Sequence, residues 1–295
     1  MTSITPDAFA GFWEMQGHRV VKTATCHWYD AQPWAFLSIP YHWHVSPSPR
    51  ELVQLLLLGA AVRYPAPANT SHSAESGLFV RSGKNYDFSA LHPKARNQTR
   101  RGLERCSVEQ VEFSWLAEHG ASLNEDTMRR QERDPESMNR NKWKKYCDAA
   151  SRTSGFEAWA AFVDGSLASF AATALIEDCF SILHQASATQ FLDQCPNNAL
   201  VFSLTRAKLS DTQVAYISYG LKSIDKTDTL NHFKSRMGFT LRPFHDRLVL
   251  NPAVKGFLRL GGRHLVQAMA RRHPQNDTLR KASRAIQSSA EELSA

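Results

Sequence analysis

The sequence predicts a mixed α/β fold of the α+β type, and two observations carry that prediction. From residue 108 onward the expected elements run strand, two helices, three strands, helix, strand, helix and strand, which differs from the regular alternation of a parallel α/β sheet. An Asp164-Gly165 turn separates two alternating segments, the pattern of an antiparallel hairpin. Hydrophobic residues make up 42% and charged residues 21% of the 295 residues, which is ordinary for a globular chain.

The first 85 residues are expected to contain two strands and one helix. Trp34–Ile39 has the pattern of a strand. Ser48 can cap a helix that carries proline in its first turn, and Glu51 completes a capping box. This helix is expected to run through the leucines that follow and to stop before Pro65. Leu78–Arg81 is expected to form a short strand.

The middle of the chain is expected to supply most of the sheet and its helices. In chain order these elements are a helix over Pro93–Arg105, a strand over Val108–Phe113, helices over Ser114–Arg133 and Met138–Arg152, the hairpin Glu157–Val163 and Ser166–Ala174, a strand over Phe180–Ser187, a helix through Leu209 capped by Asn197 or Asn198, a strand over Gln213–Tyr219, a helix over Thr227–Met237 ended by Gly238, and one or two strands over Phe239–Leu250. Residues 253–292 are expected to be helical. The predicted organisation is therefore a partial domain over 1–85, a main domain over 86–252 and a helical tail over 253–295.

The net charge of +7 is concentrated in the tail. Residues 255–284 contain eight Lys and Arg residues against one Asp, so they account for the charge of the whole chain and the rest is near neutral. If Ala253–Arg272 forms one helix, it is amphipathic, with Phe257, Leu265 and Met269 on its apolar arc. Such a tail either packs on the body of the protein or binds an anionic membrane surface or RNA.

The chain has no sequence sign of secretion or of a metal site. Its five cysteines form no CxxC pair, and Met1–Ala10 lacks the pattern of a signal peptide, so a cytoplasmic protein with free thiols is expected. His42 and His44 would share one face of a strand, but no third or fourth ligand accompanies them. No metal is therefore expected. Walker, Rossmann and nucleophile-elbow motifs are also absent from the sequence.

Three segments resemble the Fem-like branch (FemABX) of the GNAT acyltransferase superfamily. They are the basic segment Lys94–Arg101, the helix start Pro196–Leu200, and Leu230–Phe239 with its Phe-Lys pair and closing Gly-Phe. The last is the most specific. The resemblance covers about Tyr86–Pro252, and Arg50–Pro67 is similar to a shortened N-terminal half.

The resemblance implies a GNAT-like N-acyltransferase fold that uses acetyl-CoA or another acyl-CoA. The donor would lie where the strands Phe180–Ser187 and Gln213–Tyr219 diverge, with Gln185 and Ser187 on the first of them. Its pyrophosphate would sit at the following helix start, Asn197-Asn198-Ala199, since a helix N-terminus favours anions. Residues 194–199 lack the glycines of a typical GNAT loop. Fem-like proteins lack them too, and some of these use aminoacyl-tRNA instead.

The resemblance also suggests catalytic and substrate-binding residues. Lys234 occupies the place where many GNATs have a tyrosine, so it would protonate the leaving thiolate or stabilise negative charge. Tyr219 and Asp225 are the other catalytic candidates, and Lys222 and His184 are candidates for holding the substrate. The alternatives are a solvated helix lysine for Lys234, loop solvation for Lys222 and Asp225, and a core or surface histidine for His184.

The expected function is transfer of an acyl group, acetyl first, from acyl-CoA to the amine of a small molecule or a peptide. One alternative is a Fem-type aminoacyl transferase that binds charged tRNA through the basic segment Lys94–Arg105 and the tail. The other is a degenerate GNAT fold that acts as a non-catalytic binding module. A solvated basic helix remains the simpler interpretation of Lys94–Arg105.

Overall fold

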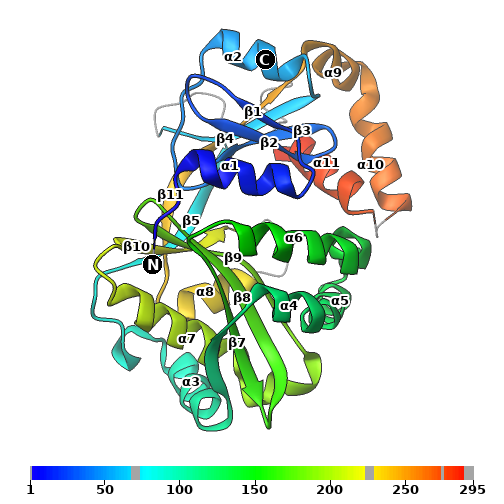
Figure 1. Ribbon diagram of the computed structural model, residues 1–295. Coiled ribbons are helices and arrows are strands. Elements are labelled where there is room, and N and C mark those ends of the chain that lie inside the picture. The colour runs from blue at the N-terminus through cyan, green and yellow to red at the C-terminus, as the bar shows by residue number, and fades with distance from the viewer. Residues whose placement is uncertain (1, 68–73, 223–228, 274–275, 289–295) are drawn as a thin grey trace.

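The computed structural model describes residues 2–67, 74–222, 229–273 and 276–288 (Figure 1). Within these residues eleven strands form one sheet, in the order β1-β2-β3-β4-β11-β5-β10-β9-β8-β7-β6. The strands are β1 (Val20–Lys22), β2 (His27–Gln32), β3 (Ala35–Ile39), β4 (Ala61–Ala66), β5 (Ala74–Ser82), β6 (Ser107–Val111), β7 (Phe156–Val163), β8 (Ser166–Ile176), β9 (Cys179–Ser187), β10 (Tyr216–Leu221) and β11 (Thr240–Leu250).

Helices cover both faces of this sheet, so the predicted mixed α+β class is confirmed. They are α1 (Pro6–Met15), α2 (Pro49–Leu56), α3 (Pro93–Arg105), α4 (Phe113–His119), α5 (Ala121–Arg130), α6 (Arg140–Arg152), α7 (Pro196–Leu209), α8 (Thr229–Arg236), α9 (Pro252–Phe257), α10 (Arg263–Arg272) and α11 (Asp277–Ser288), with short turns η1 (Phe88–Ala90), η2 (Pro135–Met138), η3 (Thr189–Gln194) and the π-helical η4 (Leu258–Gly262). Among the described residues no helix is both long and apolar enough to cross a bilayer.

The sheet has two halves, which β5 and β11 join (Figure 1). The eleven-residue β11 pairs with β5 along Thr240–Asp246 and with β4 along His245–Leu250, so one strand belongs to both halves. The strand β5, from the expected N-terminal partial domain, also pairs with β10 of the expected main domain. Hydrogen bonding in the sheet therefore continues across residue 85, while the domain boundaries at 85 and 252 stay predictions.

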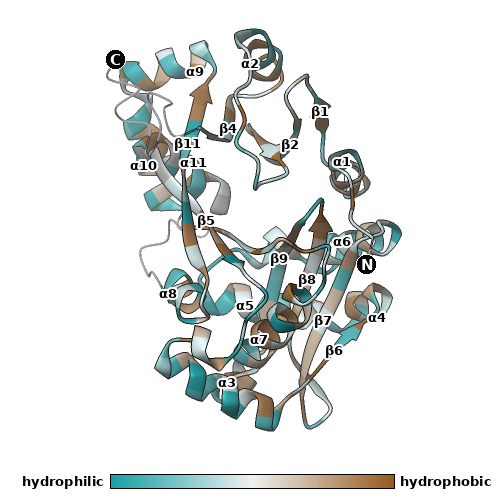
Figure 2. Cartoon of the chain, turned by 90° about the vertical axis from the view of Figure 1, so that its left-hand side faces the viewer, coloured by the Kyte–Doolittle hydropathy of each residue, from teal (hydrophilic) through white to brown (hydrophobic). Residues whose placement is uncertain are grey.

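Two hydrophobic cores lie on opposite faces of β7–β9, the mainly hydrophobic strands of Figure 2. Adjacent residues of β8 divide between them, Ala171 facing one core and Ala172 the other, as alternation along a strand requires. The first core lies under α3 and α7, and the second under α1, α4, α5 and α6. A third core lies between α2 and the strands β2–β4. This layering holds α5 and α7 on either side of β9.

The helix predicted after Ser48 begins as expected but is shorter. Ser48 Oγ accepts from Glu51 N, and the Glu51 carboxylate accepts from Ser48 N at 2.8 Å, so the capping box is present. The expected continuation to Pro65 is wrong, because α2 ends at Leu56 and the next apolar run is strand β4. Periodicity alone cannot distinguish a fully buried strand from a helix, and here pairing with β3 and β11 decides.

Contacts at both ends fix the position of α7. At its start, a Cβ added to Gly102 of α3 would lie 2.6 Å from Cys195 O, so only glycine allows this approach of the two helices. At its end, Lys208 Nζ lies 2.5 Å from Glu157 Oε1 of β7. The expected capping by Asn197 or Asn198 is wrong, because Cys195 is the N-cap, in the left-handed conformation and without a side-chain cap bond. Pro196 takes the first helical position, where a missing N–H is harmless.

Candidate active site

The strands β9 and β10 run parallel for three residues and then separate. Their last paired residues are Ser181 and Ser218. Beyond that point β10 bends through Gly220, whose φ of 71° favours glycine, and continues along β5. On β9, Leu183 is an extra residue relative to β8, a β-bulge that interrupts the ladder. The edge of β9 from Ile182 onward is therefore open toward the gap, which is the divergence that the sequence predicted.

A cavity of about 360 Å³ fills this gap. It is lined from α5 and the residues just after it, and from β9, α7, β10 and α8. The lining residues are Asn124, Thr127, Met128, Arg130, Gln131, Arg133, Ile182, Leu183, His184, Gln185, Ala186, Ser187, Asn197, Tyr219, Gly220, Leu230, Phe233 and Lys234. Among the described residues that line it there is no Asp or Glu. Arginine and lysine side chains without a lining carboxylate favour a ligand with negative or partly negative oxygen atoms.

Lys234 projects from α8 into the cavity wall and is only 4% exposed. Its Nζ donates to Leu221 O at 3.0 Å and lies 5.1 Å and 5.3 Å from the ring centres of Phe79 and Tyr219. Burial away from water disfavours the ammonium form and lowers the pKa of Lys234 to about 8. Lys234 is therefore no solvated surface lysine, and its pKa lies closer to neutral pH than that of a free lysine.

A chain of hydrogen bonds leads from Tyr219 to the far end of the cavity. The Tyr219 hydroxyl donates to Gln185 Oε1, and Gln185 Nε2 donates to Asn197 Oδ1 at 2.9 Å. Asn197 Nδ2 donates in turn to Ser187 Oγ at 3.1 Å, while its Oδ1 also accepts from Ser169 Oγ at 2.7 Å. Burial raises the pKa of Tyr219, so its hydroxyl stays protonated and keeps this donor role.

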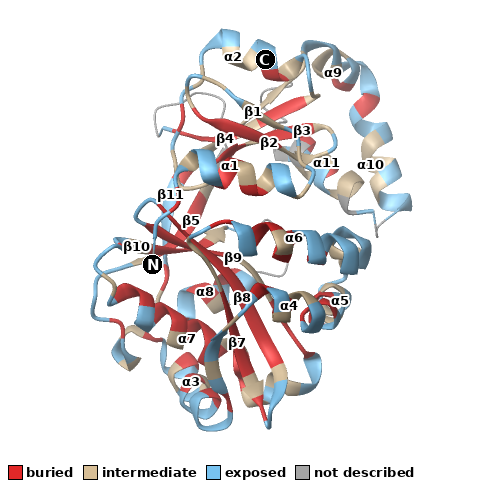
Figure 3. Ribbon diagram, in the orientation of Figure 1, coloured by how far each residue is buried: buried red, intermediate tan, exposed pale blue. Residues whose placement is uncertain are grey.

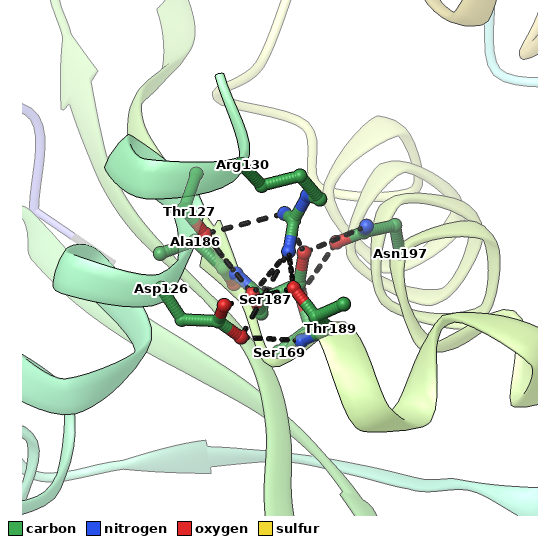
Figure 4. A network of polar contacts seen from close by, with 8 residues as sticks. All are labelled: Asp126, Thr127, Arg130, Ser169, Ala186, Ser187, Thr189 and Asn197. Carbon is green, nitrogen blue, oxygen red and sulfur yellow. Dashed lines mark hydrogen bonds and ion pairs between the residues drawn. The ribbon is translucent and has the colours of Figure 1, made fainter. Parts of the chain in front are cut away.

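Arg130 closes the other end of the same network (Figure 4). Its guanidinium donates to Ser187 O at 3.1 Å, to Ser187 Oγ at 2.9 Å and to Thr189 Oγ1 at 2.7 Å. Thr127 Oγ1 accepts from Ser187 N at 2.9 Å and donates to Ser187 O at 3.0 Å. Asp126 binds the N–H and hydroxyl of Thr189 and lies 4.0 Å from Arg130. These bonds tie α5 to the end of β9 and set the cavity's width.

The partly buried His184 and the buried Asn124 form a hydrogen-bonded pair between β9 and α5. His184 Nε2 lies 2.7 Å from Asn124 Oδ1, and the imidazole is 5.3 Å from the Trp143 ring. Burial lowers the pKa of His184 to about 4, so the ring is neutral at pH 7 and its Nε2–H donates to the amide oxygen. Asn124 Nδ2 is buried and, within the described residues, has no hydrogen-bond partner. An unpaired buried donor in a cavity wall is suited to a ligand oxygen.

The fold is similar to that of several proteins of known structure. No protein-family model matches the sequence, and neither does any curated protein at a significant level. Among solved structures, FemX superposes with a TM-score of 0.57 at 12% identity, covering 85% of this chain and 92% of FemX. The C-terminal DUF2156 domain of a putative lysylphosphatidylglycerol synthetase from Agrobacterium fabrum gives 0.58 at 11% identity, covering 86% and 90%. A conserved protein of unknown function from Bacteroides thetaiotaomicron gives 0.55 at 10% identity, covering 84% and 92%.

The chain shares the fold of FemX and of the DUF2156 domain. The expected resemblance is thus confirmed for the fold. In this Fem-like fold β9 and β10 are the diverging strands, and the cavity lies at their junction.

The Fem-like fold brings six of the ten predicted site residues to the cavity, and they are His184, Gln185, Ser187, Asn197, Tyr219 and Lys234. Asn198 and Ala199 do not line it. Both are buried, Ala199 against Gly102 of α3 and Asn198 beside Met237, and their backbone N–H groups donate to Cys195 O at 3.1 Å and 3.2 Å. Lys222 is exposed beyond the end of β10, and its backbone N–H donates to Gly77 O. Asp225 lies outside the described residues.

Sequence reasoning missed the wall that α5 contributes. Asn124, Thr127, Met128 and Gln131 line the cavity at spacings of three, four and seven residues, which is one face of a helix. A stripe of polar residues on the face that packs toward a sheet was the signal available in the sequence. The expected single helix over Ser114–Arg133 obscured it, because the chain breaks at Gly120 and α5 starts a new direction.

Proposed function

We propose that this protein transfers an acyl group to an amine. The observation that carries the proposal is the cavity at the divergence of β9 and β10, with the buried Lys234 and Tyr219 on one wall and the bulged edge of β9 on the other. The fold shared with FemX supports it. The acceptor would be the amine of a small molecule or a peptide.

In the proposed reaction the acyl carbon exchanges its bond to the leaving group for a bond to the amine. The amine nitrogen forms a bond to the acyl carbon, the bond from that carbon to the leaving group breaks, and the nitrogen gives up a proton to water. The same solvent returns a proton to Lys234 after it has protonated the leaving group. Lys234, with its pKa near 8, protonates the leaving group or stabilises the developing negative charge. Asn124 Nδ2 and the backbone at the Leu183 bulge are placed to donate to a substrate oxygen. Tyr219 holds Gln185 in position through its hydroxyl.

Acyl-CoA, with acetyl-CoA tried first, is the proposed donor. Ligand that binds the native state raises the melting temperature by mass action, so a thermal-shift screen with acetyl-CoA and longer acyl-CoAs tests it. A binding donor is then used in transfer assays with amine acceptors. Lys234→Met should lower kcat about 100-fold, whereas Lys145→Met, on the exposed face of α6, should leave it unchanged. Unaltered kcat in Lys234→Met would remove Lys234 from the chemistry.

A second candidate donor is aminoacyl-tRNA, and the start of α7 favours it. The first-turn amides of Asn198 and Ala199 donate to Cys195 O, and that of Ala199 packs against Gly102 of α3, at the helix start where a CoA pyrophosphate would be expected in the GNAT scheme. The neighbouring α3 exposes Lys94, Arg100 and Arg101 to solvent. This candidate predicts tRNA binding that weakens steeply with salt and no stabilisation by any acyl-CoA. If neither acyl-CoA nor tRNA binds, the remaining candidate is a non-catalytic binding module with the same fold.

The proposed compartment is the cytoplasm. All five cysteines are free and buried, and burial raises the pKa of Cys26 to about 12 and of Cys179 to about 11. Free thiols in this number fit a reducing environment. Of the described residues, none form a group of three or more potential metal ligands.

A further inference from the structure

The C-terminal segment turns sharply between α9 and α10 and leaves apolar side chains in solvent. Gly261 has a φ of 103°, and the Phe257 ring occupies the place where a Cβ of Gly262 would lie. The expected single amphipathic helix over 253–272 is therefore kinked. Leu258 is buried, but Leu260 at the kink is 91% exposed.

The exposed apolar side chains continue onto α2. Asn251, just before α9, donates from Nδ2 to Leu56 O at 2.8 Å and from its backbone N–H to Ala60 O at 2.8 Å, so α9 starts beside the end of α2. Leu57 there is 80% exposed. Figures 1 and 3 show α2 and α9 side by side at the end of the molecule away from α3 and α7, with exposed residues on both.

The segment that supplies four of these apolar side chains is basic. Residues 253–272 contain five Lys and Arg residues and no Asp or Glu. We name the whole the tail surface; it consists of the exposed Val53, Leu57, Leu58, Phe257, Leu260, Leu265 and Met269 together with Lys255, Arg259, Arg263, Arg271 and Arg272. Leu265 and Met269 are one helical turn apart on α10 and lie on one face.

We propose that the tail surface docks the protein on a membrane that contains anionic lipid. Arginine side chains bind lipid phosphate, and the exposed leucines and Phe257 enter the region between headgroups and acyl chains. RNA would use the arginines but gains nothing from aliphatic side chains, which cannot stack on bases. The combination of exposed leucines with an all-basic segment therefore matches lipid better than nucleic acid.

Co-sedimentation of the full chain with vesicles tests the proposal. Vesicles of phosphatidylcholine with phosphatidylglycerol should bind at least about tenfold more tightly than phosphatidylcholine alone, since each Lys or Arg near an anionic surface adds attraction. The double variant Leu57→Ser/Leu260→Ser should weaken that binding about tenfold, and Arg263→Glu/Arg271→Glu about tenfold or more. All these side chains are exposed, and circular dichroism checks that each variant folds.

Matched variants on other helices are the controls. Leu103→Ser on α3 and Arg152→Glu at the end of α6 change an exposed leucine and an exposed arginine outside the tail surface and should leave vesicle binding unchanged. The proposal is overturned if the anionic vesicles do not bind, or if the leucine variant binds them as wild type does. Binding of tRNA that depends on Arg263 and Arg271, without vesicle binding, overturns it in favour of RNA.

Discussion

Lys234 is the residue on which the proposed chemistry depends most, and its burial has a measurable consequence. The ammonium group keeps one backbone acceptor, Leu221 O, and two aromatic rings in place of water. These contacts do not replace hydration fully, because the pKa of Lys234 falls from 10.5 to about 8. Burial of this ammonium group destabilises the fold, and buried groups with such shifted pKa values are typical of functional sites.

This lowered pKa predicts how stability depends on pH. Between about pH 8 and 10.5 the folded chain has already released the Lys234 proton while the unfolded chain still holds it, so the free energy of unfolding rises with pH through that range. The contribution should be about 2–3 kcal/mol. Urea unfolding of wild type and Lys234→Met at pH 7.5, 9 and 10 measures it. The free energy of unfolding of wild type should rise relative to that of Lys234→Met as the pH rises. A difference between the two proteins that does not change with pH would contradict the buried ammonium.

The lowered pKa of His184 predicts how stability changes in the acidic range. Its pKa is lowered to about 4, so between pH 6.5 and 4 the unfolded chain takes up a proton that the folded chain does not. Stability should therefore fall as the pH decreases through this range, and no further loss from His184 is expected below about pH 4. In His184→Gln, whose amide can still donate to Asn124 Oδ1, this part of the loss should disappear. Thermal melts of both proteins at pH 7, 5.5 and 4.5 provide the comparison.

At the scale of elements, the close approach of α3 to α7 is what sets the start of α7. A Cβ added at residue 102 would meet the backbone oxygen of Cys195. A backbone atom cannot move aside as the end of a flexible side chain can. The cavity residue Asn197 follows directly in the first turn of α7. The packing of two helices therefore decides where a site side chain stands.

Two glycine-to-alanine variants separate this packing from helix propensity. Gly102→Ala should destabilise the protein by about 1–3 kcal/mol, because the added carbon forces α3 away from α7. Gly11→Ala in α1, where nothing lies within 4 Å of the added carbon, should stabilise by about 0.5–1 kcal/mol. Melting temperatures of the two variants should therefore move in opposite directions. A neutral Gly102→Ala would show that the two helices are not held at this distance.

At the scale of the whole molecule, the shared strands β5 and β11 couple the two halves of the sheet. Neither half can lose these strands without breaking hydrogen bonds of the other. We therefore expect the lobe that carries the cavity and the lobe that carries the tail surface to move as one unit. A protein docked through the tail surface would hold its cavity at a fixed orientation to the membrane.

One cooperative unfolding transition is expected from this coupling. Tryptophans lie in both halves, for example Trp28 beside α2 and Trp143 in α6, so fluorescence reports on both. Urea transitions followed by tryptophan fluorescence and by far-ultraviolet circular dichroism should coincide. Two separated midpoints would show that the halves unfold independently, and would support the boundary expected at residue 85.

Local patterns in the sequence predicted many elements correctly. The helix Pro93–Arg105 has the expected bounds, and the Asp164-Gly165 hairpin and the capping box at Ser48 are present. These features depend on residues close in sequence, through capping, turn geometry and periodicity. The concentration of charge in the tail is likewise a property of the sequence alone.

The first 33 residues show the limit of such patterns. No element was assigned there, yet α1, β1 and β2 are present, and Phe9 and Phe12 are buried against α6 and β7. In the same way β4 was expected as helix, because its apolar run is compatible with either state. Partners far away in sequence select the conformation in both cases.

The same distinction between local sequence and distant contacts applies to the candidate site. The sequence by itself determined the capped helix, the hairpin and the concentration of charge, because these depend on neighbouring residues. Its resemblance to Fem-like proteins pointed to two diverging strands and to Lys234, Tyr219, Gln185, Ser187 and Asn197, which line the cavity in the structure. Only the tertiary structure decided that Asn197 bonds Gln185 rather than capping α7, that Ala199 is covered by α3, and that Asn124 and Arg130 line the cavity from α5. Those outcomes depend on how closely α3, α5 and α7 approach β9, and such distances are set by packing between segments that no local pattern connects.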